Sequence, residues 1–192
     1  MTYRNIALLG RGRAGKDTVG ERLVSRWAYT RVAFADPLKE AALSVDPIVT
    51  YEPAGYGPLP VRLSAVVKRL GWEAAKDCVP EVRRTLQRLG QAARDQNPDH
   101  WVDLAMDKLI VADAWGLPVA VTDVRHINEC EALKTLGFTL VRVVRPGAPA
   151  LGKNALHQSE TALDDYPVDL TIANAGTLAD LDCAADGLVQ YR

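Results

Sequence analysis

The chain has 192 residues, of which 48% are hydrophobic and 24% are charged, and its formal net charge is −1. This length and composition predict one domain with a sizeable core. The near-zero net charge argues against a long nucleic acid as partner and favours a small charged ligand.

The three cysteines, Cys78, Cys130 and Cys183, are far apart in the sequence and form no CxxC motif. This pattern indicates neither a disulfide framework nor a zinc site and is typical of the reducing cytoplasm. We find no signal-peptide core near residue 1 and no stretch of roughly eighteen apolar residues. The sequence therefore predicts a cytoplasmic protein without a membrane span.

Strand-like runs alternate with segments of helical periodicity, which predicts an α/β fold with a parallel sheet and crossover helices. The expected strands span residues 6–9, 31–34, 118–121, 138–144 and 168–172. The first helix should begin within residues 15–17 and bury Val19, Leu23 and Trp27, which share one face. Trp72 and Trp115 are also assigned to packing.

An insertion too long for a simple crossover separates the second and third expected strands. Residues 46–60 are rich in proline and glycine and are expected to be irregular, with helices following at 61–70, 80–97 and 100–114. We interpret residues 36–115 as a helical lobe that covers a substrate. A second segment marked by glycine and proline, 146–167, is interpreted as a mobile flap.

A phosphate-binding loop is predicted directly after the first strand. Residues 10–16 fit the pattern G-x-x-x-x-G-K, and a helix follows, as this loop requires. Glycines let successive N–H groups point at phosphate oxygens, the helix N-terminus adds its dipole, and Lys16 can reach the β- and γ-phosphates. The residues expected to bind the nucleoside triphosphate are Gly10, Gly12, Arg13, Ala14, Gly15, Lys16, Asp17 and Thr18.

One position departs from the general motif, because Asp17 stands where a Ser or Thr hydroxyl usually meets Mg²⁺. The Asp17 carboxylate could bind Mg²⁺ directly or through water, or it could cap the helix. The sequence leaves both interpretations open.

Several ordered segments resemble the phage-type deoxynucleoside monophosphate kinases, beginning with Gly15-Lys16-Asp17-Thr18, which is similar to their GKDT loop. Their FADPLK, VRxxLQxLG, DVRxxNE and HxSE segments have counterparts at residues 34–39, 82–90, 123–129 and 157–160, with Arg94 and Trp101 at the expected intervals. Gln91 departs from the family pattern, and residues 49–60 do not align.

The resemblance covers nearly the whole chain. It implies one P-loop kinase domain, 1–192, with a three-layer α/β/α fold like that of adenylate kinase and a five-stranded parallel sheet in the order 2-3-1-4-5. It also implies ATP as phosphoryl donor, Mg²⁺ as cofactor and a deoxynucleoside monophosphate as acceptor, bound by the lobe. The expected partners are small nucleotides only, the expected state is a monomer or homodimer, and the compartment is the host cytoplasm if a phage encodes the chain.

Phosphoryl transfer between nucleotides needs cations more than it needs a base. The acceptor phosphate, with a second pKa near 6, is already mostly ionised at pH 7, so the obstacle is repulsion between anions. Catalysis should therefore come from positioning and from cations around the transferring group. The candidate cations are Lys16, Arg83, Arg94, Arg125 and Arg145.

Arg125 follows the third expected strand, at the carboxyl edge where open α/β sheets bind ligands. Asp123 beside it could hold Mg²⁺ through water, orient Arg125 by an ion pair, or cap the strand end. Asn128 and Glu129 are expected to fix the turn and the start of the next helix.

Arg83 and Gln87 lie one helical turn apart and share a face, which together with Arg94 could bind the acceptor phosphate and base. Ordinary solvated charges on an amphipathic helix are the alternative. Asp36 and Lys39 lie at another ligand-facing strand end, although Asp36-Pro37 is also a common helix start, with Asp as the cap.

Three further residues have two interpretations each. Trp101 could line the acceptor pocket or pack in the core. His157 is either a flap residue of the HxSE segment or an ordinary surface histidine. Asn174 lies where the resembling folds border the donor adenine, and the alternative there is a plain turn with Thr177 as helix cap.

Two other functions stay open on the sequence alone. One is a P-loop kinase of another phosphorylated metabolite, such as phosphomevalonate or dephospho-coenzyme A, because its donor site would look the same. The other is a nucleotide-binding switch that transfers no phosphoryl group. Two features argue against it: arginines near strand ends are typical of a transfer site, and the guanine-binding motif N-K-x-D of GTPases is absent from the sequence.

Overall fold

Two compact units make up the chain. The computed structural model describes residues 2–147 and 162–192. The core unit comprises Met1–Phe34 and Val102–Arg192, and the inserted unit comprises Ala35–Trp101. No helix within the described ranges is both long and apolar enough to cross a membrane. The single kinase domain, the lobe at 36–115 and the flap at 146–167 stay predictions, and most of the expected flap lies outside the described residues.

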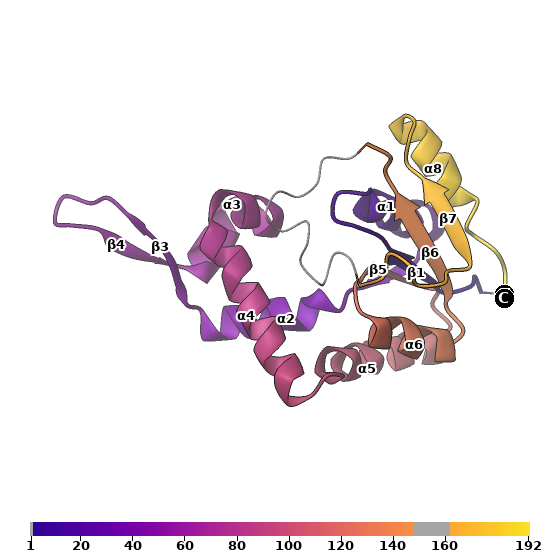
Figure 1. Ribbon diagram of the computed structural model, residues 1–192, viewed down its shortest axis with the longest axis horizontal. Helices are drawn as coiled ribbons and strands as arrows, with labels where there is room; N and C mark the ends of the chain where they lie inside the picture. The colour runs from indigo at the N-terminus through magenta and orange to yellow at the C-terminus, as the bar shows by residue number, and fades with distance from the viewer. Residues whose placement is uncertain (1, 148–161) are drawn as a thin grey trace. The chain divides into compact units, whose positions relative to one another are not determined.

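The core unit is built on a sheet of β1 (Ile6–Leu9), β2 (Thr30–Val32), β5 (Val119–Val124), β6 (Thr139–Val144) and β7 (Leu170–Ala173) (Figure 1). The spatial order is β2-β5-β1-β6-β7, and all neighbours are parallel. When these five strands are numbered among themselves, the order is 2-3-1-4-5. The predicted fold class is therefore confirmed, and β1 lies at the centre of the sheet.

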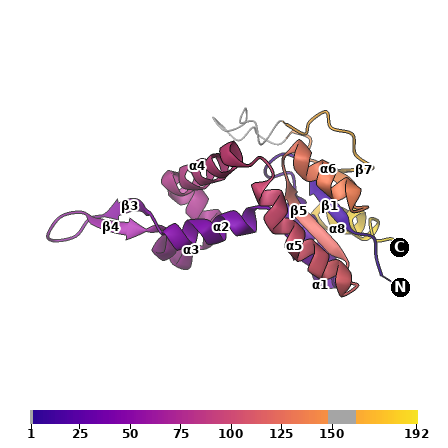
Figure 2. The ribbon, with the colours of Figure 1, turned by 90° about the horizontal axis from the view of Figure 1, so that it is seen from below.

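Helices cover both faces of this sheet. The helices α1 (Lys16–Trp27) and α8 (Leu178–Asp186) lie on one face, and α5 (His100–Ala114) and α6 (Ile127–Thr135) lie on the other (Figure 1, Figure 2). The side chains of β1 alternate between the two layers: Ile6 and Leu8 pack with the α1/α8 layer, and Ala7 and Leu9 pack with the other. The apolar run of β1 is thus explained by burial on both faces.

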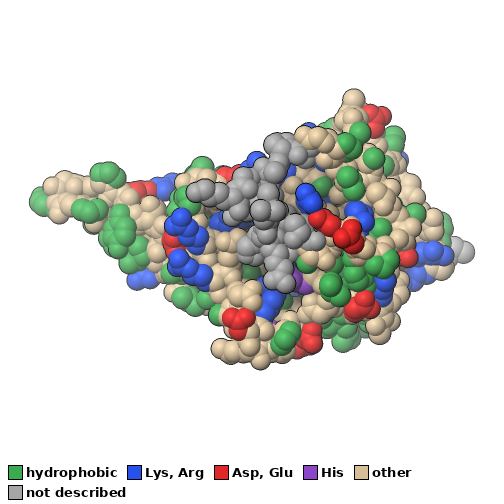
Figure 3. Space-filling model, in the orientation of Figure 1, with side chains coloured by type: hydrophobic (Ala, Val, Ile, Leu, Met, Phe, Trp, Pro, Cys, Tyr) green, Lys and Arg blue, Asp and Glu red, His purple; other side chains and the backbone are tan. Residues whose placement is uncertain are grey.

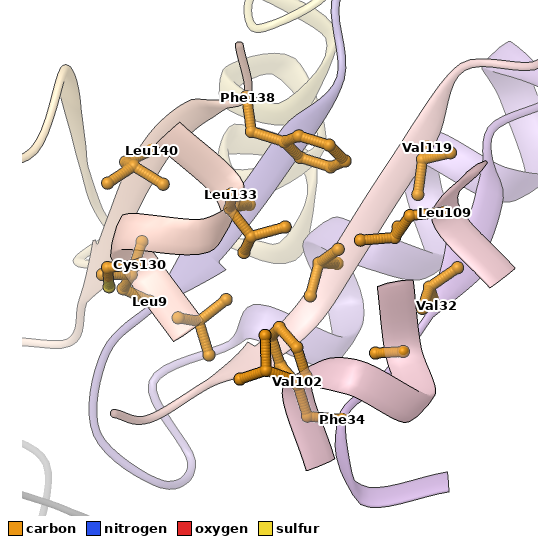
Figure 4. Packing of buried hydrophobic residues seen from close by; sticks show 14 of the residues in the cluster. Leu9, Val32, Phe34, Val102, Leu109, Val119, Cys130, Leu133, Phe138 and Leu140 are labelled. Carbon is orange, nitrogen blue, oxygen red and sulfur yellow. The ribbon is translucent and has the colours of Figure 1, made fainter. Parts of the chain in front are cut away.

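Figure 4 shows the core beneath α5 and α6, where Leu9 and Val119 of the sheet face Leu109 and Leu133 of the helices. Cys130 lies in the same cluster and is fully buried. Burial raises the pKa of the Cys130 thiol to about 12. The thiol is therefore uncharged at neutral pH and serves in packing.

Asp186 ties α1 to α8. Its carboxylate accepts hydrogen bonds from Nε and Nη2 of Arg22, at 2.9 and 2.6 Å, and from Nε1 of Trp27 at 2.7 Å. These donors, Arg22 above all, hold the pKa of Asp186 well below its ordinary value.

Trp27 is half-buried, as its packing assignment requires. The assignment of Trp115 is wrong: it is 78% exposed, because it follows the last turn of α5 at the surface.

The inserted unit has a core of its own. It contains α2 (Ala35–Val45), β3 (Ile48–Glu52), β4 (Leu59–Arg62), α3 (Leu63–Cys78) and α4 (Pro80–Gln96). Its buried side chains are Ala42, Val49, Leu63, Val66, Ala75 and Val82. The helix expected at 61–70 is confirmed: α3 begins at Leu63, and Gly71, whose φ of +74° and ψ of 166° are not helical, separates this first part from a second helical part that ends at Cys78. Glycine adopts this φ without strain, so the chain can leave the helical conformation there and resume it after a kink.

The expectation of an irregular segment at 46–60 is wrong, because β3 and β4 form an antiparallel hairpin in which Tyr51 pairs with Pro60. Glycine and proline between the strands form the turn, and Pro60 is tolerated because both strands of a two-stranded sheet are edges. The run of β-branched and aromatic residues at 48–51 was the strand signal that the turn residues obscured. Hydrophobic side chains line the exposed hairpin (Figure 3), among them Tyr51 at 61% and Leu59 at 58% exposure.

Thr122 on β5 is 3% exposed, and its Oγ1 is the one buried side-chain oxygen or nitrogen that has no hydrogen-bond partner among the described residues. We expect Thr122→Val to raise the free energy of unfolding by about 1 kcal/mol, because a methyl group of similar size replaces a buried hydroxyl that has lost its water. Urea denaturation of the two proteins measures the difference. Thr122→Ala, the control, should destabilise by a similar amount through the cavity it leaves. A Val variant less stable than the parent would contradict this account.

Candidate functional site

The predicted phosphate loop connects β1 to α1 through residues with alternating backbone handedness. Gly10, Arg13 and Gly15 have positive φ values of 131°, 63° and 108°. A Cβ on Gly10 would lie 2.3 Å from the carbonyl oxygen of Val143, so only glycine fits at the first position. Backbones that alternate in this way form concave nests of N–H groups, which suit anions.

Lys16 is the most enclosed cation of this loop. It is 6% exposed, and its Nζ donates to the carbonyl oxygens of Gly10 at 2.7 Å and Arg11 at 2.9 Å. A buried ammonium must be hydrogen-bonded, and here the loop itself supplies the acceptors. The loop therefore curls around the lysine, so that ammonium, N–H nest and helix N-terminus share one small region.

Asp17 is exposed in the first turn of α1. The N-cap of α1 is Gly15, which has no side chain, and Asp17 is the acid of the first turn, as one interpretation expected. As an acid in the first turn it interacts favourably with the helix dipole. Its role in Mg²⁺ binding stays a prediction. The nucleotide-binding role of Thr18, the next and half-buried residue, also stays a prediction.

Asn174 joins the loop to the end of β7. Its Nδ2 donates to the carbonyl of Ala14 at 2.9 Å, while its own N–H donates to Val144 at 2.7 Å. The predicted cap at Thr177 is confirmed: its side chain and that of Asp180 form a capping box at the start of α8. Asn174 thus holds the loop in place from a neighbouring strand. Arg145, just after β6, is exposed.

The carboxyl end of β5 carries Asp123 and the half-buried Arg125. The Oδ1 of Asp123 accepts the N–H of Phe34 at 2.8 Å, which links the ends of β2 and β5 and matches the expected strand-end role. Glu129, 2% exposed, accepts the N–H groups of Arg125 at 2.7 Å and His126 at 3.1 Å. The structural role predicted for Glu129 is confirmed, and the main chain of Arg125 is fixed by it.

An ion pair at the loop was missed by sequence reasoning. Arg11 makes a bidentate contact with Asp164, at 3.2 Å from Nε to Oδ1 and 2.5 Å from Nη2 to Oδ2. The Asp164 segment is itself held by Arg142, which donates to the carbonyls of Leu163 at 2.8 Å and Tyr166 at 2.5 Å. Arg11 occupies an unspecified position of the G-x-x-x-x-G-K pattern, so the motif gave no signal for it.

The inserted unit carries the remaining candidates. Asp36 lies within the first turn of α2, which begins at Ala35, and Lys39 is 3.5 Å from it. On α4, Arg83 is half-exposed and lies 3.2 Å from Asp77, and Gln87 and Arg94 are half-buried. The structure therefore places Arg83, Gln87 and Arg94 on one helix of this unit.

Trp101 is 4% exposed, and its Nε1 donates to the carbonyl of Gly90 at 3.1 Å. These contacts favour the core-packing alternative over a direct wall of an acceptor pocket. His157 and the HxSE segment at 157–160 lie outside the described residues, so that prediction stands as made.

The loop fits a nucleoside triphosphate, because its N–H nest, helix N-terminus and buried lysine all favour phosphate oxygens. For Mg²⁺, the chain offers single carboxylates and no preformed cluster of ligands among the described residues. Among the described residues, no group of three or more Asp, Glu, His or Cys side chains is placed to hold a metal ion. Phosphate-bound Mg²⁺ commonly needs only one or two protein carboxylates, and Asp17 and Asp123 are the candidates in this chain.

Sequence comparisons match most of the chain. The sequence profile of the family described as Deoxynucleotide monophosphate kinase matches residues 65–184. This range begins within α3 and ends within α8. It does not contain the phosphate loop, so the loop is independent support for a nucleotide-binding role.

Three viral relatives show the extent of the similarity. The Uncharacterized protein ORF77 of Ictalurid herpesvirus 1 (strain Auburn) is 39% identical over 102 residues, 52% of this chain and 44% of that protein. The Deoxynucleotide monophosphate kinase of Enterobacteria phage T4 is 36% identical over 103 residues, 52% and 42% of the two chains. An Acanthamoeba polyphaga mimivirus protein, provisionally given the same enzyme name, is 26% identical over 186 residues, 90% and 89%. The match thus spans less than half of the first two relatives.

The Arg11–Asp164 pair generates a pH prediction. Arg11 holds the pKa of the Asp164 carboxyl below its ordinary value of 3.8, against a smaller opposing effect of burial. The pair is partly exposed, with side-chain exposures of 62% and 37%, so we expect it to contribute at most about 1 kcal/mol. A lowered folded-state pKa means that this stabilisation is complete above the ordinary carboxyl pKa and is lost as pH falls through the lowered value.

Carboxyl-carbon NMR titration measures this pKa directly. In Arg11→Gln, the Asp164 pKa should return toward the ordinary carboxyl range, while the pKa of Asp180, which depends on Thr177, stays low. An Asp164 pKa that does not move on removal of Arg11 would show that the ion pair is not populated in solution.

Proposed function

This chain belongs to the deoxynucleotide monophosphate kinase family, and from that premise we propose that it transfers the γ-phosphoryl group of ATP to a deoxynucleoside monophosphate. The products are ADP and the deoxynucleoside diphosphate. The observation that carries the proposal is the loop around Lys16, whose ammonium is buried beside an N–H nest at the start of α1.

The donor half of the reaction is assigned to the core unit. The loop N–H groups and the α1 N-terminus bind the β- and γ-phosphates, and Lys16 moves its ammonium from loop carbonyls to phosphate oxygens when ATP binds. Asp17 and Asp123 are the residues that would hold Mg²⁺, which would supply neutralisation of the phosphate charge. Arg13, Arg145 and Asn174 are assigned to the donor nucleotide.

The acceptor half is assigned chiefly to the inserted unit. Arg83 and Arg94 would bind the acceptor phosphate, Gln87 its base, and Asp36 and Lys39 the nucleoside, while Trp101 supports α4 through Gly90. The acceptor phosphate attacks as an anion, because it is already mostly ionised at pH 7 and needs no base. Its oxygen forms a bond to the γ-phosphorus as the bond from phosphorus to the β,γ-bridging oxygen breaks, and ADP leaves.

Arg125 is assigned to the transferring group. Its main chain is fixed by Glu129, so the guanidinium extends from a rigid turn at the carboxyl edge of the sheet. A fixed fork of N–H donors can stabilise charge on the equatorial oxygens of a transferring phosphoryl group without reorganisation.

A coupled assay of ADP release tests the proposal. The acceptors would be the four deoxynucleoside monophosphates, the four ribonucleotides, phosphomevalonate, dephospho-coenzyme A and water. ADP release that requires a deoxynucleoside monophosphate supports the proposal. Turnover only with another metabolite assigns the chain to a different acceptor, and ATP binding without acceptor-dependent turnover indicates a switch.

Lys16→Met should lower kcat by about 10² to 10³, because it removes a cation aimed at the transferring phosphoryl group while an apolar chain of similar length fills its place. Lys68→Met is the matched control, since Lys68 is exposed on α3, and it should turn over normally. Steady-state kinetics with saturating substrates measures both. An unchanged kcat in the Lys16 variant would contradict the proposed role of the phosphate loop in catalysis.

Arg83 and Arg125 should have separable roles. Arg83→Lys should mainly raise the KM of the acceptor, because Arg83 binds ground state and transition state alike. Arg125→Ala should lower kcat by about 10³ or more, as loss of an arginine finger does. Arg125→Lys should not restore full activity, because the ammonium lacks the bidentate fork. Kinetics with ATP and acceptor varied separately decides this, and equal defects in both parameters for both variants would refute the division.

A further inference from the structure

A cavity of about 650 Å³ lies in the core unit at the amino edge of the sheet. It is lined by Asn5, which directly precedes β1, by Phe138 and Thr139 at the start of β6, and by residues near the ends of α5 and α6. The phosphate loop follows the opposite end of β1. The cavity is thus separated from the phosphate loop by the length of the central strands, and its interpretation does not depend on the proposed kinase function.

Asn5 gives this cavity a polar donor on a residue whose other side-chain atom is fixed by a hydrogen bond. Its residue exposure is 3%, its Oδ1 accepts the N–H of Val119 at 2.9 Å, and its carbonyl accepts the N–H of Thr139 at 2.9 Å. The structure gives its side-chain NH₂ no partner among the residues it describes. Since Asn5 lines the cavity, an acceptor bound there can take a hydrogen bond from this NH₂ group in place of water.

Two arginines stand at the same cavity. Arg192 Nη1 contacts Asp113 at 2.9 Å, so this pair is neutral, and Arg4 adds a positive charge. The main chain of each is anchored: Arg4 donates its N–H to Gln190 at 2.8 Å, and Arg192 donates to Thr2 at 2.9 Å.

Two helix C-termini near the cavity offset the positive charge of Arg4 only weakly. The C-termini of α5 and α6 carry partial negative charge, worth roughly 0.3–1 kcal/mol against an anion. Carbonyls in their last turns already accept hydrogen bonds. The carbonyl of Lys134 accepts the N–H of Gly137, and the carbonyl of Asp113 accepts the N–H of Gly116. A full guanidinium charge outweighs these partial charges, so the cavity favours an anion.

The remaining walls are apolar. Leu109 and Phe138 are almost fully buried, at 3% and 6% exposure, and Leu136 is partly exposed at 38%. The volume falls within the roughly 300–1,000 Å³ typical of small-molecule sites, which combine apolar walls with a few placed polar groups.

We propose that this cavity is a second binding site, for a small organic anion with an apolar or aromatic body. An anionic oxygen of the ligand accepts from the Asn5 amide and interacts with Arg4, and the apolar body packs against Leu109, Leu136 and Phe138. A carboxylate and a phosphate monoester share this chemistry.

The test is an amide NMR titration of the full chain with benzoate and, separately, phenyl phosphate. Benzylamine and benzyl alcohol serve as cationic and neutral analogues of the same size. Saturable shifts are expected at the Asn5 side-chain amide and the main-chain amides of Gly137, Phe138 and Thr139, with either anion. The anion that binds more tightly identifies the preferred acidic group.

Three variants of the cavity sharpen the test. Asn5→Asp keeps the acceptor for Val119 but removes the NH₂ donors, and it should weaken anion binding about tenfold or more. Arg4→Gln should weaken binding about threefold, with Arg88→Gln on α4 as a control that leaves it unchanged. Asp113→Asn frees Arg192 from its partner and should tighten anion binding by a similar factor.

The proposal is overturned by equal or stronger binding of benzylamine, by shifts that do not saturate, or by anion shifts located only at the phosphate loop. It is also overturned if Arg4→Gln and Asp113→Asn both leave the anion affinity unchanged. Since these two changes lie at exposed charged residues, they keep the test decisive even if Asn5→Asp fails to fold.

Discussion

The close approach of Gly10 to the carbonyl of Val143 is the constraint on which the phosphate loop depends. The central strand β1 leaves the sheet at this point beside β6, with 2.3 Å between the carbonyl oxygen and the place a Cβ would occupy. The chain then turns back through positive φ at Arg13 and Gly15 and starts α1 at Lys16. Because the turn is this tight, the Gly10 and Arg11 carbonyls reach the lysine that follows them. The nest, the buried cation and the helix start all follow from this close approach of the β1 end to its neighbouring parallel strand.

The sequence could predict this loop because every part of it is local. Residues 10–16 are consecutive, and the spacing of their glycines predicts the path of the backbone directly. The Arg11–Asp164 pair could not be predicted in the same way, because its partners are 153 positions apart and both are ordinary surface residue types. The link from Asp123 to Phe34 was foreseen only as one of several possible roles, since a strand-end carboxylate can serve as metal ligand, ion-pair partner or cap.

The β3–β4 hairpin was missed for another reason. Its strands pair only with each other, and its central pair includes Pro60, which reads as a strand breaker in sequence. The end of the helix expected at 61–70 could be predicted, because Gly71 is a local stop signal and its backbone is not helical. At the hairpin, packing of Val49 into the small core of the inserted unit overrides the local signal.

The parallel pairing of β2 with β5 has a kinetic consequence. The hydrogen bond from Phe34 to Asp123 closes a loop of 89 positions, and the whole inserted unit lies within that loop. Loop-closure entropy rises only slowly with length, but contacts of such high sequence separation form late on a folding pathway. The inserted unit, with local helix pairs and its own apolar cluster, can collapse first and shorten the effective distance between the strand ends. We expect refolding of this protein to begin in the segment that joins the two strands, with the edge strand β2 docking among the last events.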